Sequence, residues 1–346
     1  MKHGNAIRLV STRNLSRDAW LEIRSRGIGS SDAAAAIGLS PYKSPLELWL
    51  EKTSRKPAAD LSASEPVFWG STLEPILAKV YTERTGNKVR RVNAVLQHPD
   101  HPFMLANLDR AIGGDGVLEI KTAGYHSAPQ WEEGVPEAYQ CQVLHQLAVT
   151  GKAWADVAVL IGGQDFRVYR IEREDDKAQA LVERESAFWH HVESDTAPAV
   201  DGSESSARAL GWLYPRDTGA TIDFTESSML NTLFMELLGL KRQRTQLEFL
   251  EATHRQTIEA AMGEASVANF AGGRVSWKRT RDGETTDVKR LLREHPELAA
   301  QYAVTVPGTR RFLMQVDKTA ASVPDPTSGT SSSQFSTSTN PSQEAS

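Results

Sequence analysis

The stretch from Leu108 to Thr122, LDRAIGGDGVLEIKT, constrains the fold more than any other part of this sequence. Its turn, Gly113–Gly116, contains Asp-Gly between two apolar segments, which predicts a β-hairpin. Successive side chains of a strand point to opposite faces, so Glu119 and Lys121 should lie on the same face of the returning strand. If the two strands pair across the turn, Asp109 comes close to Glu119.

Two chemical interpretations of this hairpin are open. Two carboxylates beside a lysine suit a hard cation such as Mg²⁺, together with an amine that can hold or deprotonate a water molecule. The alternative is a surface hairpin whose glutamate and lysine are only solvated, because Glu-x-Lys is common in strands. The hairpin alone does not decide between the two, so other parts of the chain must.

Helix and strand patterns alternate through the first part of the chain. Apolar spacing and capping residues predict helices within 16–51 and at 67–86, 137–150 and 174–194. Apolar strand patterns occur at 88–96, 103–109, 117–122, 155–161 and 166–172. We therefore expect an α/β domain at residues 1–200, in which a small mixed sheet is flanked by helices.

The remainder of the chain divides into three parts by composition. Residues 201–224 are predicted to be a linker. Leucines at helical spacing predict a long helix or a helical hairpin at 225–264, within a mainly helical extension of residues 225–316. This extension also has strand patterns at 272–281 and 309–316 and a helix pattern at 285–302. Residues 317–346 are rich in Ser and Thr and should form a disordered tail.

Composition excludes several classes of protein. The chain has 40% hydrophobic and 24% charged residues, and no run approaches the roughly 20 apolar residues of a membrane span. The N-terminus lacks the apolar segment of a signal peptide. Cys141 is the only cysteine, which excludes a disulfide framework and a multi-cysteine zinc site. A net charge of −5 argues against unspecific binding of polyanions. We expect a protein of the reducing cytoplasm without a membrane partner.

Two further stretches contain candidate binding residues. Arg24 precedes a glycine-containing turn that enters a helix capped by Ser30–Asp32. Free N–H groups, the helix dipole and an arginine together suit a phosphate, although an ordinary cap with a surface arginine is the alternative. In the predicted helix at 137–150, Tyr139, Gln142 and Gln146 share one polar face. Solvation explains such a face equally well.

Four motifs follow one another in the order W-x3-R-x6-S-D, W-G-x3-E, D-x9-E-x-K and A-Y-x2-Q. Together they resemble the lambda exonuclease family, also called YqaJ-like viral recombinases, over residues 16–195. This family is part of the wider PD-(D/E)xK superfamily, so the resemblance implies a restriction-endonuclease-like core. Leu108 stands where the superfamily motif has proline, which changes the stiffness of the backbone rather than the chemistry.

The resemblance implies roles for individual residues of these motifs. The implied catalytic residues are Asp109, Glu119, Lys121, Glu74 and Gln142. The implied metal ligands are Asp109, Glu119 and the carbonyl of Ile120. The implied 5′-phosphate and DNA-binding residues are Arg24, Ser31 and Tyr139. Lys121 would position or deprotonate the attacking water.

The implied activity is that of a magnesium-dependent 5′→3′ exonuclease, which degrades one strand of double-stranded DNA from its ends. The family passes the resulting 3′ single strand to a single-strand annealing protein, in phage or prophage recombination inside the bacterial host. Two Mg²⁺ ions per active site, with Mn²⁺ as a substitute, and a homotrimeric ring are implied as well. A restriction-like or junction-resolving endonuclease and a catalytically silent DNA-binding recombination factor are the alternatives.

Overall fold

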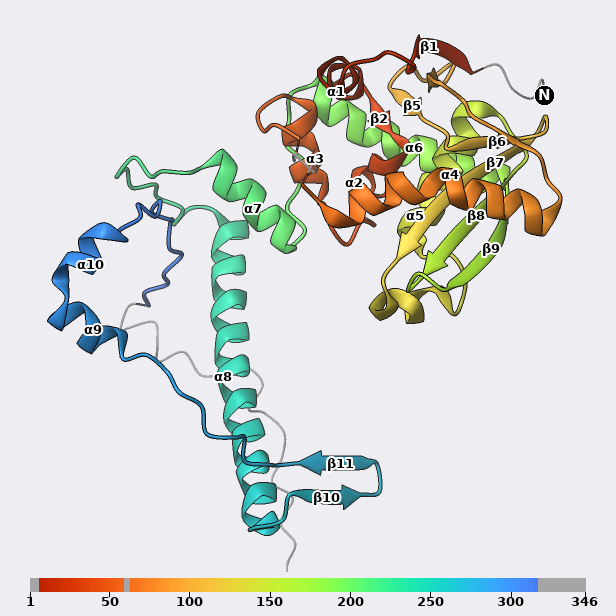
Figure 1. Cartoon of the computed structure of the whole chain (residues 1–346). Coiled ribbons are helices and arrows are strands. Elements are labelled where there is room, and N and C mark those ends of the chain that lie inside the picture. The colour runs from red at the N-terminus through yellow and green to blue at the C-terminus, as the bar shows by residue number, and fades with distance from the viewer. Residues whose placement is uncertain (1–5, 59–62, 317–346) are drawn as a thin grey trace, which may run out of the picture. The chain divides into compact units, whose positions relative to one another are not determined.

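The computed structural model describes residues 6–58 and 63–316, which belong to two units (Figure 1). The first unit ends at Pro215 and the second begins at Arg216. In the described part of the chain, no helix is long and apolar enough to cross a membrane. The elements of the first unit are β1 (Ile7–Ser11), α1 (Arg17–Ser25), β2 (Ile28–Gly29), η1 (Ser30–Asp32), α2 (Ala33–Ala36), α3 (Pro45–Lys52), α4 (Glu65–Thr85), β3 (Val89–Arg90), β4 (Ala94–Gln97), β5 (Met104–Ala106), β6 (Arg110–Ile112), β7 (Gly116–Ala123), η2 (Tyr125–Trp131), α5 (Glu137–Thr150), β8 (Trp154–Ile161), β9 (Asp165–Glu172), α6 (Asp175–Glu193) and α7 (Glu204–Leu213).

A five-stranded mixed sheet of order β3-β6-β7-β8-β9 forms the centre of the first unit (Figure 1). The predicted hairpin joins β6 and β7, which pair antiparallel with Arg110 opposite Leu118. Gly113 in its turn has φ of 50°, a conformation that glycine adopts without strain. Strands β7 and β8 are parallel, and α5 makes the crossover between them.

Helices α4 and α5 pack on opposite faces of this sheet. Leu118 and Ile120 of β7 lie in one apolar cluster with α4, whereas Val117 lies in another with α5. Since side chains alternate along a strand, Glu119 and Lys121 face α5. The predicted small mixed sheet flanked by helices is therefore confirmed.

A second sheet, of order β1-β4-β5-β2, shares the apolar core of the central sheet. The sequence predicts one strand at 103–109 that leads into the hairpin. Instead, β5 ends at Ala106 and pairs in this second sheet, and a separate strand, β6, begins at Arg110. Asp109 therefore lies where the chain passes from one sheet to the other.

Part of the predicted linker at 201–224 is a helix, α7, that packs on α3. The Ser44 amide donates to Ser205 Oγ over 2.7 Å, and Trp212 Nε1 donates to the carbonyl of Arg55 over 2.7 Å. Ala209 is buried in the same apolar cluster as α3. This segment is rich in serine and small residues, a composition typical of linkers, but here it lets two helices approach closely.

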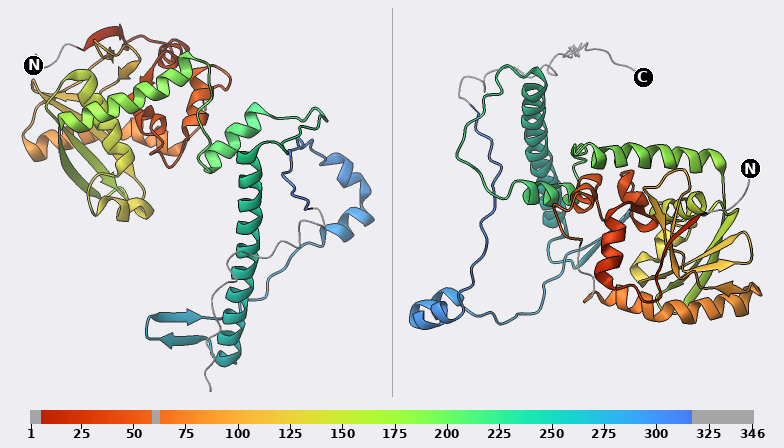
Figure 2. Two further views of the ribbon diagram at one scale, coloured as in Figure 1. Left: turned by 180° about the vertical axis from the view of Figure 1, so that it is seen from behind. Right: turned by 90° about the horizontal axis from the view of Figure 1, so that it is seen from above.

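In the second unit, α8 (Ser228–Met262) is one continuous helix of 35 residues (Figure 2). The helical hairpin is therefore the wrong alternative for 225–264, because helix-favouring Lys, Arg and Gln residues continue the helix through its middle. Strands β10 (Val267–Phe270) and β11 (Gly273–Ser276) form a hairpin, and α9 (Val288–Glu294) and α10 (Pro296–Gln301) follow.

The last predicted strand, at 309–316, is not formed: in the described part of the chain these residues pair with no strand. The predicted tail, 317–346, lies outside the described residues.

Candidate active site

Glu119 is the centre of a buried polar cluster between β7 and α5. Its side chain accepts hydrogen bonds from Lys121 Nζ and Gln142 Nε2, both at 2.6 Å to Oε1, and from Gln146 Nε2 at 2.7 Å to Oε2. Lys121 Nζ also donates to Gln142 Oε1 at 2.9 Å. The polar face of α5 is thus turned toward the sheet rather than toward solvent, and its amides fix the carboxylate and the ammonium in place.

Asp109 lies beside this cluster, as the hairpin pattern predicts. Its Oδ2 accepts a hydrogen bond of 2.8 Å from the backbone N–H of Ile120. Burial and repulsion from Glu119, with a smaller contribution from Glu74, raise the pKa of Asp109 to about 8, although the Ile120 amide and Lys121 act in the opposite direction. Carboxylates crowded in this way have a strong preference for a positive charge among them.

Lys121 supplies one positive charge and stays protonated. Burial alone would lower its pKa, but Glu119 and Asp109 raise it above the ordinary value. Its ammonium also lies 4.9 Å from the ring centre of Tyr139, a favourable cation–π distance. A protonated amine donates hydrogen bonds, so this arrangement favours positioning a water molecule over deprotonating it.

Glu74 approaches from α4 but is bound to Arg110. The Arg110 guanidinium forms an ion pair with the Glu74 carboxylate and donates to the backbone carbonyl of Asp109 at 2.6 Å. Arg110 is not among the residues predicted from the sequence, although it directly follows Asp109 in the chain. Arg110 holds the Glu74 carboxylate close enough to Asp109 to influence its pKa, and it neutralises part of the charge of Glu74.

The donor atoms around Asp109 are of the type that a hard divalent cation prefers. Asp109 and Glu119 supply carboxylate oxygens, and the buried Oε1 of Gln146 accepts no hydrogen bond from any described residue. Among the described residues, however, no three His, Cys, Asp or Glu side chains converge as metal ligands. This site therefore offers a cation two carboxylates and neutral oxygen donors, since Arg110 binds the third carboxylate, Glu74.

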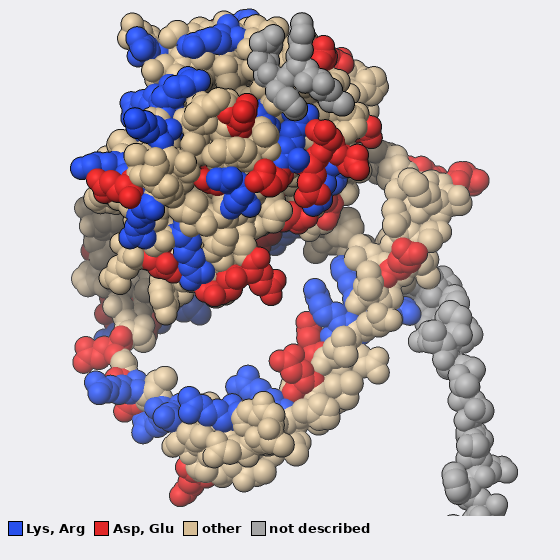
Figure 3. All heavy atoms as spheres, turned by 90° about the vertical axis from the view of Figure 1, so that its right-hand side faces the viewer, with Lys and Arg blue, Asp and Glu red and all other residues tan. Residues whose placement is uncertain are grey.

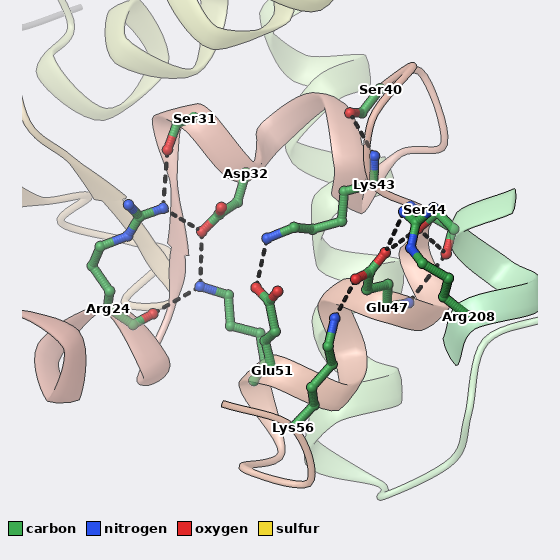
Figure 4. A network of polar contacts seen from close by, with 12 residues as sticks. Arg24, Ser31, Asp32, Ser40, Lys43, Ser44, Glu47, Glu51, Lys56 and Arg208 are labelled. Atoms are coloured by element: carbon green, nitrogen blue, oxygen red, sulfur yellow. Dashed lines mark hydrogen bonds and ion pairs between the residues drawn. The ribbon is translucent and has the colours of Figure 1, made fainter. Parts of the chain in front are cut away.

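A second group of charged residues surrounds Arg24, at the other predicted site (Figure 4). Arg24 Nη2 donates to Ser31 Oγ at 2.9 Å and to Asp32 Oδ2 at 2.8 Å, and its guanidinium lies 4.8 Å from the ring centre of Trp20. Gly29 leaves room for this side chain, because a Cβ there would lie 3.2 Å from Arg24 Nη2. The structure thus brings Arg24 and Ser31 together.

The predicted helix cap at this position is not formed. Helix α2 has only four residues, and neither it nor η1 has a side-chain cap. The Ser31 hydroxyl binds Arg24 instead, because η1 turns it toward the guanidinium. The phosphate interpretation therefore depends on side chains here and not on a helix dipole.

Asp32, which the sequence predicts only as part of a helix cap and of the first motif, and Lys52, which no motif contains, are further functional candidates. Lys52 Nζ donates to Asp32 Oδ2 and to the carbonyl of Arg24, each at 2.8 Å. Burial opposes the ionisation of Asp32, but Arg24 and Lys52 hold its pKa far below the ordinary value. Asp32 directly follows Ser31 in the first motif, whereas Lys52 carries no local signal, because α3 brings it there.

A cavity of about 1350 Å³ extends from this region to the residues that directly precede Asp109. Its walls include Arg24, Ser31 and Lys52, and also Asn107 and Leu108, which directly precede Asp109. On the face of the first unit seen in Figure 3, basic and acidic side chains are intermixed. The cavity itself is lined by basic residues together with acidic ones, among them Asp32 and Glu51, which pair with Arg24, Lys52 and Lys43.

The chain is similar to known proteins in sequence and in structure. The sequence pattern of the YqaJ-like viral recombinase domain matches residues 19–153. Uncharacterized protein YqaJ from Bacillus subtilis strain 168 is 36% identical over 296 residues, which cover 84% of this chain and 92% of the relative. The alkaline exonuclease LHK-Exo from Laribacter hongkongensis is 22% identical, with a TM-score of 0.44 over 57% of this chain and 100% of its own. A phage related exonuclease from Haemophilus somnus 129PT is 11% identical, with a TM-score of 0.38 over 49% and 96%.

Proposed function

Because this chain belongs to the YqaJ-like viral recombinase family, we propose that it is a magnesium-dependent 5′→3′ exonuclease. It would degrade one strand of double-stranded DNA from its ends and leave a 3′ single strand. The observation that carries the proposal is the cluster of Asp109, Glu119 and Lys121, held by the Gln142 amide at one face of β7. Phosphodiester hydrolysis needs such a combination of anionic ligands and a donor for water.

Each residue has a defined task in this proposal. Asp109, Glu119 and the Ile120 carbonyl would hold one or two Mg²⁺ ions, for which Mn²⁺ can substitute. When bound, Mg²⁺ offsets the charge that develops on the phosphate oxygens. Lys121 donates a hydrogen bond to the attacking water, and Gln142 fixes the lysine and Glu119. Glu74 adds negative charge near the metal site, which Arg110 limits.

The strand polarity depends on the second site. Arg24 and Ser31 line the same cavity as Asn107 and Leu108, beside Asp109. A terminal 5′-phosphate bound there by a guanidinium and a hydroxyl would fix the register of the strand. Tyr139, stacked on Trp131 and close to Lys121, would contact the strand near the scissile bond.

Assembly and partners follow from the family alone. We propose a homotrimeric ring around the DNA and transfer of the 3′ strand to a single-strand annealing protein, in the bacterial cytoplasm during phage-type recombination. Light scattering of the purified chain tests the trimer. Copurification with a single-strand annealing protein tests the transfer.

One experiment separates this function from its alternatives. Linear duplexes labelled at the 5′ or the 3′ end are incubated with the protein in Mg²⁺ or in EDTA, with a closed circular duplex as control. We expect Mg²⁺-dependent release of nucleotides from 5′ ends and an intact circle. Cutting of the circle would instead show an endonuclease. Binding without digestion, equal to that of Asp109→Ala, would show a catalytically silent DNA-binding factor.

A further inference from the structure

The β10–β11 hairpin, which follows α8, concentrates positive charge (Figure 1). Residues 265–281, which contain it, have four basic side chains and no acidic one, in a chain whose net charge is −5. The four are Arg274, Lys278, Arg279 and Arg281, and all of them are exposed. Within the described part of the chain only Arg279 forms an ion pair, with Asp282, and the two side chains are 83% and 85% exposed. Because such a pair contributes little stability, the positive charge is available to a partner.

One face of the same hairpin is apolar and aromatic. Directly opposite residues of an antiparallel pair share a face, so Ala268 and Val275 lie together. Phe270 and Trp277 each follow one of these two by two residues and therefore join their face. The pairing continues to Trp277, whose N–H donates to the Ser266 carbonyl at 3.0 Å. Phe270 and Trp277 are 48% and 45% exposed, so the hairpin keeps two large rings in contact with water.

The basic side chains flank this aromatic face. Arg274 lies opposite Asn269 on the other face of the hairpin, and the segment 278–281 directly follows Trp277. Rings that stack on bases, next to cations that contact phosphates, are what binding of a single nucleic-acid strand requires. A duplex offers phosphates but keeps its bases stacked on each other, so it would leave both rings without a partner. The combination therefore fits a single strand better than a duplex.

We propose that the β10–β11 hairpin is a second DNA site, which binds single-stranded DNA. Bases would stack on Phe270 and Trp277, and phosphates would contact Arg274, Lys278 and Arg281. The choice of DNA rests on the proposed function, because 5′→3′ digestion leaves a 3′ single strand beside the enzyme. Holding that strand would keep the enzyme on its substrate between cleavage steps. The site belongs to the second unit and uses no residue of the Asp109 cluster.

The first test removes the charges of the hairpin. Binding of a labelled oligothymidylate with a 5′-hydroxyl end is followed by fluorescence anisotropy with the full chain in EDTA, so that the strand is not cut. Arg274→Gln with Lys278→Gln and Arg281→Gln should weaken binding at least about tenfold at low salt. The slope of log affinity against log salt should fall by about 2, because each lost phosphate contact of a single strand contributes about 0.7.

The matched control removes the same number of charges from exposed positions of α8. Arg242→Gln with Arg244→Gln and Arg255→Gln should bind the oligothymidylate as wild type does, with the same salt dependence. Circular dichroism verifies that both triple variants retain their helix content.

The second test concerns stacking. Trp277→Ala should weaken binding of the oligothymidylate about tenfold, whereas Trp277→Phe, which keeps a ring, should recover most of the affinity. Phe249→Ala, which removes a ring that is 71% exposed on α8, is the control and should have no effect. Binding of a closed circular duplex should be the same in wild type and in Trp277→Ala.

Three results would overturn the proposal. Hairpin variants that bind the oligothymidylate as wild type does would mean that a protein, and not DNA, covers the rings. An equal loss in the α8 controls would show an effect of total charge or of the helix. An equal loss of the closed circle in Trp277→Ala would show a surface for any polyanion. The tests also separate this site from the proposed function, because a chain that binds the single strand through the hairpin but digests no duplex in Mg²⁺ refutes the nuclease alone.

Discussion

Replacing Asp109 by asparagine should stabilise the metal-free protein, although it should abolish the proposed activity. Asparagine keeps an oxygen that can accept the hydrogen bond from the Ile120 amide. It removes the carboxylate that burial, Glu119 and Glu74 make costly to ionise. A buried carboxylate that is costly to ionise without a bound cation is what a cation-binding function predicts.

The size of the effect follows from the pKa of Asp109, which is about 8 in the folded chain against the ordinary 3.8. Below pH 3.8 both states hold the proton. Between pH 3.8 and 8 the unfolded chain loses it while the folded chain keeps it, so the free energy of unfolding falls with rising pH and levels off above 8. The shift corresponds to at most about 6 kcal/mol, and because Asp109 is only half-buried we expect about 2–3 kcal/mol, or about 5–10 °C in melting temperature.

The assay is thermal unfolding in EDTA between pH 5 and pH 9. The advantage of Asp109→Asn over wild type should grow with pH, and Mg²⁺ should raise the melting temperature of wild type more than that of the variant. Asp115→Asn removes the same charge in the exposed turn of the same hairpin and should have no such trend. An advantage that shrinks toward pH 9, or an equal one in the Asp115 variant, would refute the reasoning.

Three further predictions concern the two sites and the core. Glu119→Ala and Lys121→Ala should each slow digestion at least about a hundredfold with unchanged circular dichroism, because each removes a group that binds the metal or the water. Arg24→Ala should slow digestion of 5′-phosphorylated duplex about ten- to a hundredfold more than that of 5′-hydroxyl duplex; equal slowing of both would assign Arg24 to general DNA binding. Glu185→Gln should lower the free energy of unfolding by about 3–5 kcal/mol, since His145 is fully buried against it at 2.8 Å. Burial lowers the pKa of His145, but Glu185 raises it overall. Denaturant titration should therefore show the full loss in free energy of unfolding below pH 6.5, and a smaller loss as the pH rises through the raised pKa of His145.

The central cluster could be predicted because its causes are local in sequence. The Asp-Gly turn fixes the hairpin, and strand alternation then places Glu119 and Lys121 on one face. The spacing of Gln142 and Gln146 likewise fixes their common face on α5. Their direction was not predictable, because a polar helix face faces solvent unless another element, here β7, presents a partner for it.

Contacts between distant elements could not be predicted from the sequence. Arg110 binds Glu74 only because α4 packs on the face of β7 opposite to α5, and nothing in either motif encodes that distance. The same holds for Lys52, which reaches Asp32 from α3. Arg110 and Lys52 carry charges that act on the residues predicted from the motifs. A motif therefore identifies the reacting groups but not their protonation states.

Helix α7 shows a third kind of limit, because polar contacts help to fix its position beside the small apolar contact of Ala209. Glu47 of α3 is buried, and its carboxylate accepts from Ser205 and pairs with Lys56 and, at 3.3 Å, with Arg208 (Figure 4). Burial opposes its ionisation, but Lys56 and Ser205 lower its pKa below the ordinary value, so Glu47 stays charged. A charged group removed from water needs all of its partners, and α7 supplies two of them. Apolar periodicity cannot detect a helix fixed in this way, and so its serine-rich sequence predicted a linker.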